Sequence, residues 1–106
     1  MIIRNGKTEL SPAYDFLNST IVLHGDIEEI ALPINGKKSK LNRELLVNYF
    51  GKEQCGLTDK VIEKTLSSFQ QVFPMWFERI ENSFLSDEMK EKFMSLLQNR
   101  IQSIGL

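Results

Sequence analysis

The first candidate for chemistry in this chain is Asp15, which stands near the N-terminus in residues 10–16 (Leu-Ser-Pro-Ala-Tyr-Asp-Phe). Pro12 favours a turn directly after a short hairpin-like segment, and such a turn can present one carboxylate at the mouth of a cleft. Mg²⁺ is commonly held by one or two carboxylates, with phosphates and water completing its shell. The sequence therefore predicts Asp15 as a Mg²⁺ ligand. The alternative is a carboxylate that caps its own turn.

Other reactive residue types are too few for most catalytic or metal sites. The chain has one His and one Cys, so it cannot assemble a structural zinc site alone. His24 lies in a His-Gly-Asp segment that predicts an exposed turn. Cys55, beside Gly56, is expected to be a small buried residue rather than a nucleophile. The six glycines are scattered without the spacing of a phosphate-binding loop, so we predict no nucleotide-binding loop. We also predict no catalytic residue in this chain.

One basic cluster follows in the middle of the chain, formed by Lys37, Lys38, Lys40 and Arg43. It stands next to an Asn-Gly turn, so one interpretation is a solvated hairpin tip. The other is a contact for phosphate or nucleic acid, since Lys and Arg neutralise phosphate charge. No ladder of exposed aromatic residues accompanies the cluster, which argues against binding of single strands by stacking.

The composition is that of a small soluble domain. The chain has 106 residues, 42% of them hydrophobic and 25% charged, with a net charge of −1. This length predicts a single domain over residues 1–106, and the charge predicts no strong general attraction to nucleic acid or anionic membrane. The N-terminus lacks the pattern of a signal peptide, and no apolar run is long enough to span a membrane. A single cysteine suits a reducing compartment, so we expect a cytoplasmic protein without a membrane partner.

The chain divides near residue 41 into a hairpin and loop part (1–40) and a helical part (41–106). Residues 2–4 and 8–10 flank Asn5-Gly6, which favours a type I′ hairpin turn. Residues 20–23 and 29–32 are rich in β-branched or aliphatic residues and predict two further extended runs. Asn35-Gly36 predicts a second tight turn. The expected fold is α+β, mainly α, with short N-terminal hairpins before three main helices.

The three helices are predicted from their caps and their apolar spacing. The first covers residues 43–50, with Asn42 as its cap and Gly51 as its stop. The second opens at Thr58-Asp59 and continues beyond Pro74, where a kink is expected. The third begins after Ser86 and ends at Gly105.

An aromatic group in the second helix has helical spacing and is expected to be core rather than a ligand box. Its members are Phe69, Phe73, Trp76 and Phe77. They surround the helix on more than one side, so some of this surface is expected to pack on another part of the protein. The third helix is expected to bury a stripe of apolar side chains that runs from Met89 to Ile104.

Residues 10–16 resemble the Ser/Ala-Pro-Ala-Tyr-Asp-Leu segment of HipA-like serine/threonine kinases, the toxin half of a bacterial toxin–antitoxin pair. Residues 30–37 look like the hairpin that follows in that family, and the helices after Asn42 look like the end of its C-terminal lobe. The resemblance implies that Asp15 acts like the metal-binding Asp of kinases, holding Mg²⁺ bridged to the phosphates of ATP. Tyr14 and Phe16 would then be packing residues that fix the direction of the carboxylate.

The sequence departs from the kinase pattern in parts that catalysis requires. Upstream of Asp15 there is no other Asp, although a kinase lobe of this type has its catalytic Asp and a metal-binding Asn there. The triplet His24-Gly25-Asp26 follows Asp15 instead, and the residue five positions beyond Asp26 is Ala31, which cannot bind metal. The ATP-binding Lys and its covering loop are also absent. Mg²⁺ and ATP are therefore expected only in the context of a complete kinase, and the isolated chain is expected to bind neither.

Two functions are consistent with these observations. The first is a fragment, a truncated form or one half of a split HipA-like kinase, which supplies Asp15 and is inactive alone. The second is a non-catalytic helical interaction module that binds an antitoxin-like partner, or DNA through the basic cluster. The expected partner is the missing kinase portion in the first case and the antitoxin-like protein or DNA in the second.

Overall fold

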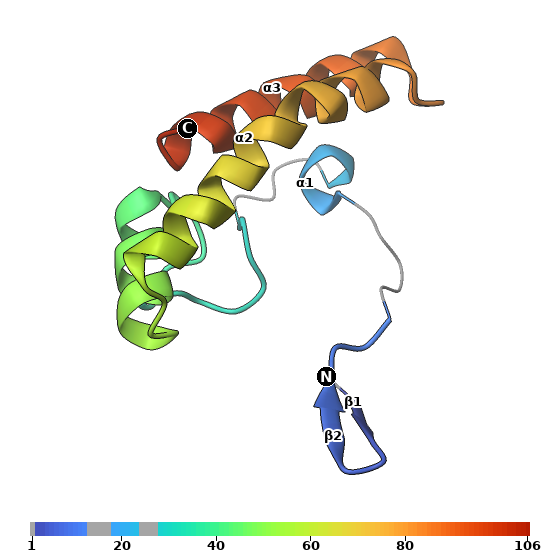
Figure 1. Cartoon of the computed structure of the whole chain (residues 1–106). Helices are drawn as coiled ribbons and strands as arrows, with labels where there is room; N and C mark the ends of the chain where they lie inside the picture. The colour runs from blue at the N-terminus through green and yellow to red at the C-terminus, as the bar shows by residue number, and fades with distance from the viewer. Residues whose placement is uncertain (1, 13–17, 24–27) are drawn as a thin grey trace.

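The computed structural model describes residues 2–12, 18–23 and 28–106, and it has the small α+β, mainly helical fold that the sequence predicts. Figure 1 shows a hairpin at the N-terminus and two long helices at the C-terminal end of the chain. The elements in chain order are β1 (Ile2–Arg4), β2 (Lys7–Glu9), α1 (Ser19–Val22), the π-helix η1 (Glu44–Gln54), α2 (Asp59–Glu81) and α3 (Asp87–Ser103).

The predicted N-terminal hairpin is present. β1 and β2 are antiparallel, with Ile3 opposite Thr8, and Asn5 and Gly6 have the positive φ angles of 51° and 73° that a type I′ turn requires. The second strand begins and ends one residue earlier than predicted, which leaves Leu10 outside it. Within the described residues the hairpin contacts no helix, and Figure 1 shows it set apart from the helical part.

The prediction of two further extended runs, at residues 20–23 and 29–32, is wrong. Residues 19–22 form the short helix α1, whose Ile21 is buried, and α1 contacts α3. The contact with α3 therefore outweighs the strand preference of the β-branched side chains. Residues 29–32 form no strand; only Ile34 and Lys37 pair, around the predicted turn at Asn35-Gly36.

The first predicted helix has the right start and the wrong end. The Asn42 side chain accepts a hydrogen bond from the Leu45 amide at 3.0 Å, as a cap does. Gly51 does not stop the helix, because η1 runs on to Gln54, and the glycine with the left-handed backbone is Gly56, at φ 65°. Gly51 is instead buried: a β-carbon there would lie 3.4 Å from the Leu46 carbonyl oxygen.

The two long helices begin and end close to where the caps predict. Thr58 accepts from the Val61 amide and Ser86 from the Met89 amide, each at 3.4 Å. α2 continues through Pro74 without a break, and Gly105, at φ 71°, follows the end of α3. Figure 1 shows α2 and α3 running side by side, with the first half of α2 diverging toward η1.

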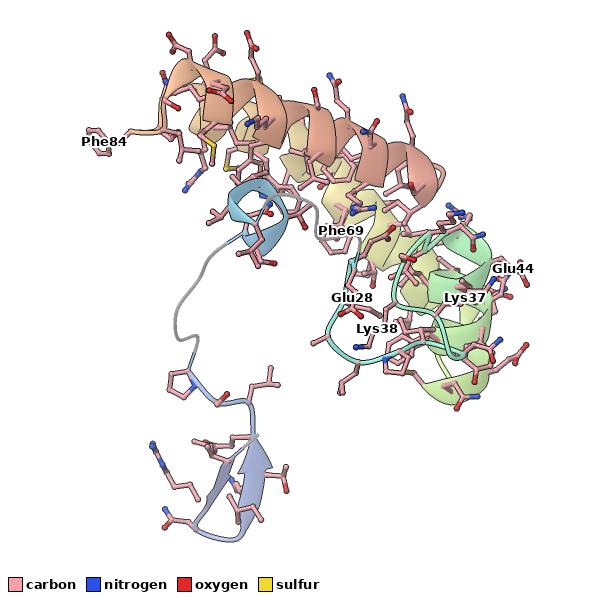
Figure 2. The ribbon with its side chains drawn as sticks, turned by 180° about the vertical axis from the view of Figure 1, so that it is seen from behind. Glu28, Lys37, Lys38, Glu44, Phe69 and Phe84 are labelled. Carbon is pink, nitrogen blue, oxygen red and sulfur yellow. The ribbon has the colours of Figure 1, made fainter. Side chains whose placement is uncertain are left out.

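The core is thin for a chain of this length. Five apolar residues among those described are buried, and none is less than 2% exposed: Ile21, Leu41, Leu45, Ile62 and Ile80. The accessible surface is 8582 Å², roughly 2,500 Å² above the ~6,100 Å² expected for a folded monomer of this mass. The radius of gyration of 16.0 Å likewise exceeds the ~13 Å expected of a compact chain. Phe84 is the most exposed of the large apolar side chains in the described residues, and Figure 2 shows it pointing away from the helices.

Candidate docking surface

The predicted metal ligand lies outside the described residues. Asp15 belongs to residues 13–17, so the structure provides no geometry for it, and its role stays a prediction. His24 and Asp26 are likewise outside the described ranges. Among the residues that the structure does describe, no group of three His, Cys, Asp or Glu side chains is arranged to hold a metal ion.

Two members of the basic cluster are engaged in contacts within the chain. Lys38 forms an ion pair with Glu28 at 3.3 Å, on the loop shown in Figure 2. Arg43 Nη1 donates to the Ile104 carbonyl oxygen at 2.9 Å, which fastens the start of η1 to the end of α3. Lys37 and Lys40 are exposed and have no ion pair with a described residue. The cluster therefore offers two lysines without an ion pair to a described residue, rather than four such cations.

Cys55 is exposed and free, so the expectation of a buried residue was wrong. It follows the end of η1, and Gly56 directly after it has the backbone of a helix stop. Because η1 extends to Gln54, Cys55 stands at the end of the helix, where it is exposed.

The aromatic group of α2 forms a partly exposed cluster instead of a buried core. The ring centroids of Phe73 and Trp76 are 5.6 Å apart and those of Phe69 and Trp76 are 6.0 Å apart, both in edge-on geometry. Phe69 is 41% exposed and Trp76 is 36% exposed, while Phe73 and Phe77 are half-buried. The expectation of core packing was therefore wrong for two of the four rings, because the described residues provide too little chain to cover them.

Three of these rings, Phe69, Phe73 and Trp76, line a hollow of about 380 Å³. The opposite wall comes from α3, where Leu97, Ile101 and Ile104 are half-buried, and Ile30 closes one side from the loop. The α3 stripe has the predicted spacing, but none of its residues is fully buried. Figure 2 shows Phe69 directed toward the region between α2 and the loop that carries Glu28.

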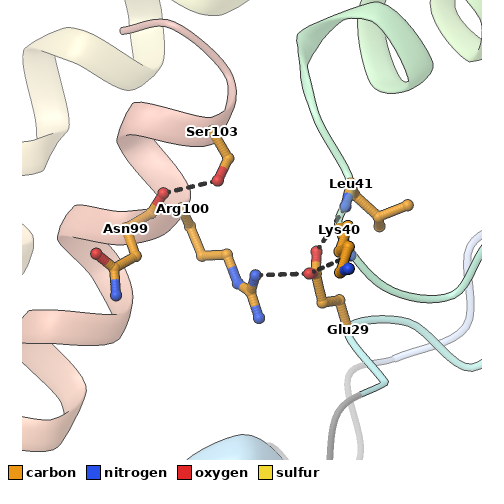
Figure 3. A network of polar contacts seen from close by, with 6 residues as sticks. All are labelled: Glu29, Lys40, Leu41, Asn99, Arg100 and Ser103. Atoms are coloured by element: carbon orange, nitrogen blue, oxygen red, sulfur yellow. Dashed lines mark hydrogen bonds and ion pairs between the residues drawn. The ribbon is translucent and has the colours of Figure 1, made fainter.

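A polar network at the rim of this hollow holds the loop to α3. Glu29 accepts from the backbone amides of Lys40 at 2.7 Å and Leu41 at 3.2 Å, and it pairs with Arg100 Nη1 at 2.9 Å (Figure 3). The Glu29 side chain is only 13% exposed. Sequence reasoning placed Glu29 in an extended run and missed this role, because no local signal links it to a residue 71 positions further along the chain.

A second hollow of about 320 Å³ continues from the first between the same two helices. It shares Trp76 and Leu97 with the first hollow and adds Ile80, Phe93 and Arg79. We call the two hollows together the α2–α3 seam. Arg79 is exposed at its rim and has no ion pair with any residue in the described ranges.

The chemistry available in the seam is burial of apolar groups. The polar side chains that line the first hollow are already engaged: Glu29 with Arg100, and Ser103, whose hydroxyl donates to the Asn99 carbonyl oxygen at 2.8 Å. Apart from these, its lining is aliphatic or aromatic. Such a surface suits docking of apolar side chains and provides no pair of groups for acid–base catalysis.

Comparison with known proteins does not identify a family. No protein-family model matches the chain, and the search of curated proteins found no match. Of the helices that the structure describes, none has the length and apolar character needed to cross a membrane.

Proposed function

We propose that this chain is a docking module that completes its fold on a second polypeptide through the α2–α3 seam. One observation carries the proposal: the apolar stripes of α2 and α3 have the spacing of a protein core, yet Phe69 and Trp76 stay exposed and no α3 residue is buried. Exposed apolar side chains that gather on one surface are typical of sites where proteins interact.

The partner proposed is the remaining portion of a HipA-like serine/threonine kinase. Residues 10–16 support this choice, since their likeness to the metal-binding segment of that family is the most specific signal in the sequence. In the assembled protein Asp15 would hold Mg²⁺, which neutralises the phosphates of ATP during phosphoryl transfer. The chain alone is proposed to be inactive, and the complex is proposed to work in the cytoplasm, where the exposed Cys55 stays reduced.

Co-expression with the protein encoded directly upstream tests this function. We expect a stable one-to-one complex by light scattering after size exclusion, and autophosphorylation only in the complex. Asp15→Asn is expected to abolish the activity and leave the complex intact, whereas the matched control Glu9→Gln, on the exposed hairpin, retains it. Absence of a complex would overturn the docking proposal, and full activity of Asp15→Asn would overturn the assignment of Asp15.

An interaction module that binds DNA is the alternative that Lys37 and Lys40 favour. Phosphate contacts weaken steeply with salt, so a gel shift of duplex DNA that is lost on raising the salt, and lost in a Lys37→Ala, Lys40→Ala double variant, would support it. A DNA complex that needs no upstream protein would argue against the kinase partner.

A further inference from the structure

The side chains that line the α2–α3 seam are regularly spaced, and this spacing indicates which kind of segment can fill the seam. On α2 the side chains that line it stand three or four positions apart, at 69, 73, 76 and 80, and on α3 they stand at 93, 97, 101 and 104. Each wall therefore covers twelve residues, with about 16 Å between its first and last positions, or three helical turns.

This spacing fits a helix better than a strand. Side chains on one face of a helix recur about every 5–6 Å, so the ridge of a third helix can enter the groove between two others. In a strand the side chains on one face recur at roughly 6.6–6.8 Å and lose register with such walls within three repeats. A second copy of this chain fits poorly, because two seams facing each other would place hollow against hollow.

The positive charge of Arg79 at the rim of the seam adds a second requirement for the partner segment. Arg79 lines the second hollow and has no ion pair with a described residue, while the other arginine of the seam, Arg100, already pairs with Glu29. A partner that approaches this end of the seam is complementary if it carries a carboxylate there.

The seam leaves apolar surface that a third helix can cover. Phe69 is 41% exposed and Trp76 is 36% exposed, and removing such side chains from water favours association.

We infer that the α2–α3 seam binds an amphipathic α-helix of the partner protein, with large apolar side chains at i, i+4 and i+7 and a carboxylate that meets Arg79. The inference rests on the proposed docking function and specifies its partner by chemistry. The apolar side chains fill the two hollows on either side of Trp76, and the carboxylate sets the direction of the helix.

Trp76 is the single tryptophan of the chain and reports on the seam directly. The probe is a synthetic peptide of about 18 residues, long enough to form a helix in water, with leucines at i, i+4 and i+7 and glutamates near one end. We expect it to shift Trp76 emission to shorter wavelength. A peptide of the same composition with alternating leucines, the pattern of a strand, is expected to give no shift.

The charge requirement is tested by exchange. A peptide with lysines in place of the glutamates is expected to bind the chain roughly two- to five-fold more weakly, as for an exposed ion pair. The variant Arg79→Glu reverses this preference. Lys60→Glu makes the same change of charge at an exposed position outside the seam and preserves the preference. Circular dichroism establishes that both variants fold.

Three outcomes overturn the inference: equal shifts with the helical and alternating peptides, a preference that Arg79→Glu does not reverse, or an emission shift that follows the concentration of the chain without peptide. The last would indicate a second copy. If the upstream protein forms its complex and shifts Trp76 emission, but the helical and alternating peptides give equal shifts, docking at the seam stands and the helix is wrong. A complex that leaves Trp76 emission unchanged would place the docking elsewhere on the chain and overturn both proposals.

Discussion

Glu29 is the residue that holds the loop of residues 28–41 against α3. Its carboxylate receives two backbone amides and Arg100, and most of it is shielded from water. Glu29→Ala leaves these donors without their acceptor, which typically costs about 1–3 kcal/mol where they are shielded. We expect a loss of stability in that range, measured by urea unfolding monitored by circular dichroism.

Lys38→Ala, on the same loop, is the control for this change. Lys38 pairs with Glu28 at the surface, where the lysine side chain is 38% exposed. Exposed ion pairs contribute about 0–1 kcal/mol, so the control is expected to unfold near the wild-type midpoint. Equal losses for the two variants would show that Glu29 is no more than a surface charge.

At the level of the elements, the two glycines near the end of η1, Gly51 and Gly56, differ in backbone conformation. Gly56 has φ 65° with open space around it, so Gly56→Ala places a side chain on left-handed backbone, at a cost of about 1–2 kcal/mol. Gly51 lies inside the helix without a positive φ, and a β-carbon there makes an ordinary contact. We expect Gly51→Ala to be close to neutral by urea unfolding, and a larger loss at Gly51 than at Gly56 would contradict this assignment of the helix end.

Local signals predicted the parts of the fold that depend on few neighbouring residues. The turn at Asn5-Gly6 and the caps at Asn42, Thr58 and Ser86 follow from side chains that bond or bend the adjacent backbone, and the structure confirms them. The wrong assignments depend on distant contacts. α1 forms where Ile21 is buried and the element contacts α3, and the 29–32 run is replaced by a loop fastened through Glu29.

The candidate site was predictable only in part. The aromatic spacing in α2 is visible in the sequence, and so is the expectation that some of it packs on another part of the protein. The second wall of the seam was not, because helix periodicity predicts which side chains share a face and leaves open which helix that face meets. Neither the position of Arg79 at the rim nor the pairing of Arg100 carries a local signal.

At the scale of the whole molecule, the thin core predicts weak cooperativity of the isolated chain. The denaturant dependence of unfolding follows the area that unfolding exposes, and this chain leaves an unusual share of its surface exposed when folded. We expect a urea m-value below that of compact domains of the same length and strong binding of a hydrophobic dye. Addition of the upstream protein is expected to raise the m-value and displace the dye. A steep, dye-free transition of the chain alone would contradict this prediction.

Calorimetric titration of the chain with the upstream protein at several temperatures tests the central claim most directly. Burial of apolar surface on binding produces a negative heat-capacity change. If about 1,000 Å² of apolar surface is covered, we expect this change to be on the order of −0.5 kcal/mol/K. The variant Phe73→Asp places a charge in the seam and is expected to abolish the heat of binding. No binding by the wild-type chain, or binding with a heat-capacity change near zero that Phe73→Asp leaves unaltered, would contradict the account.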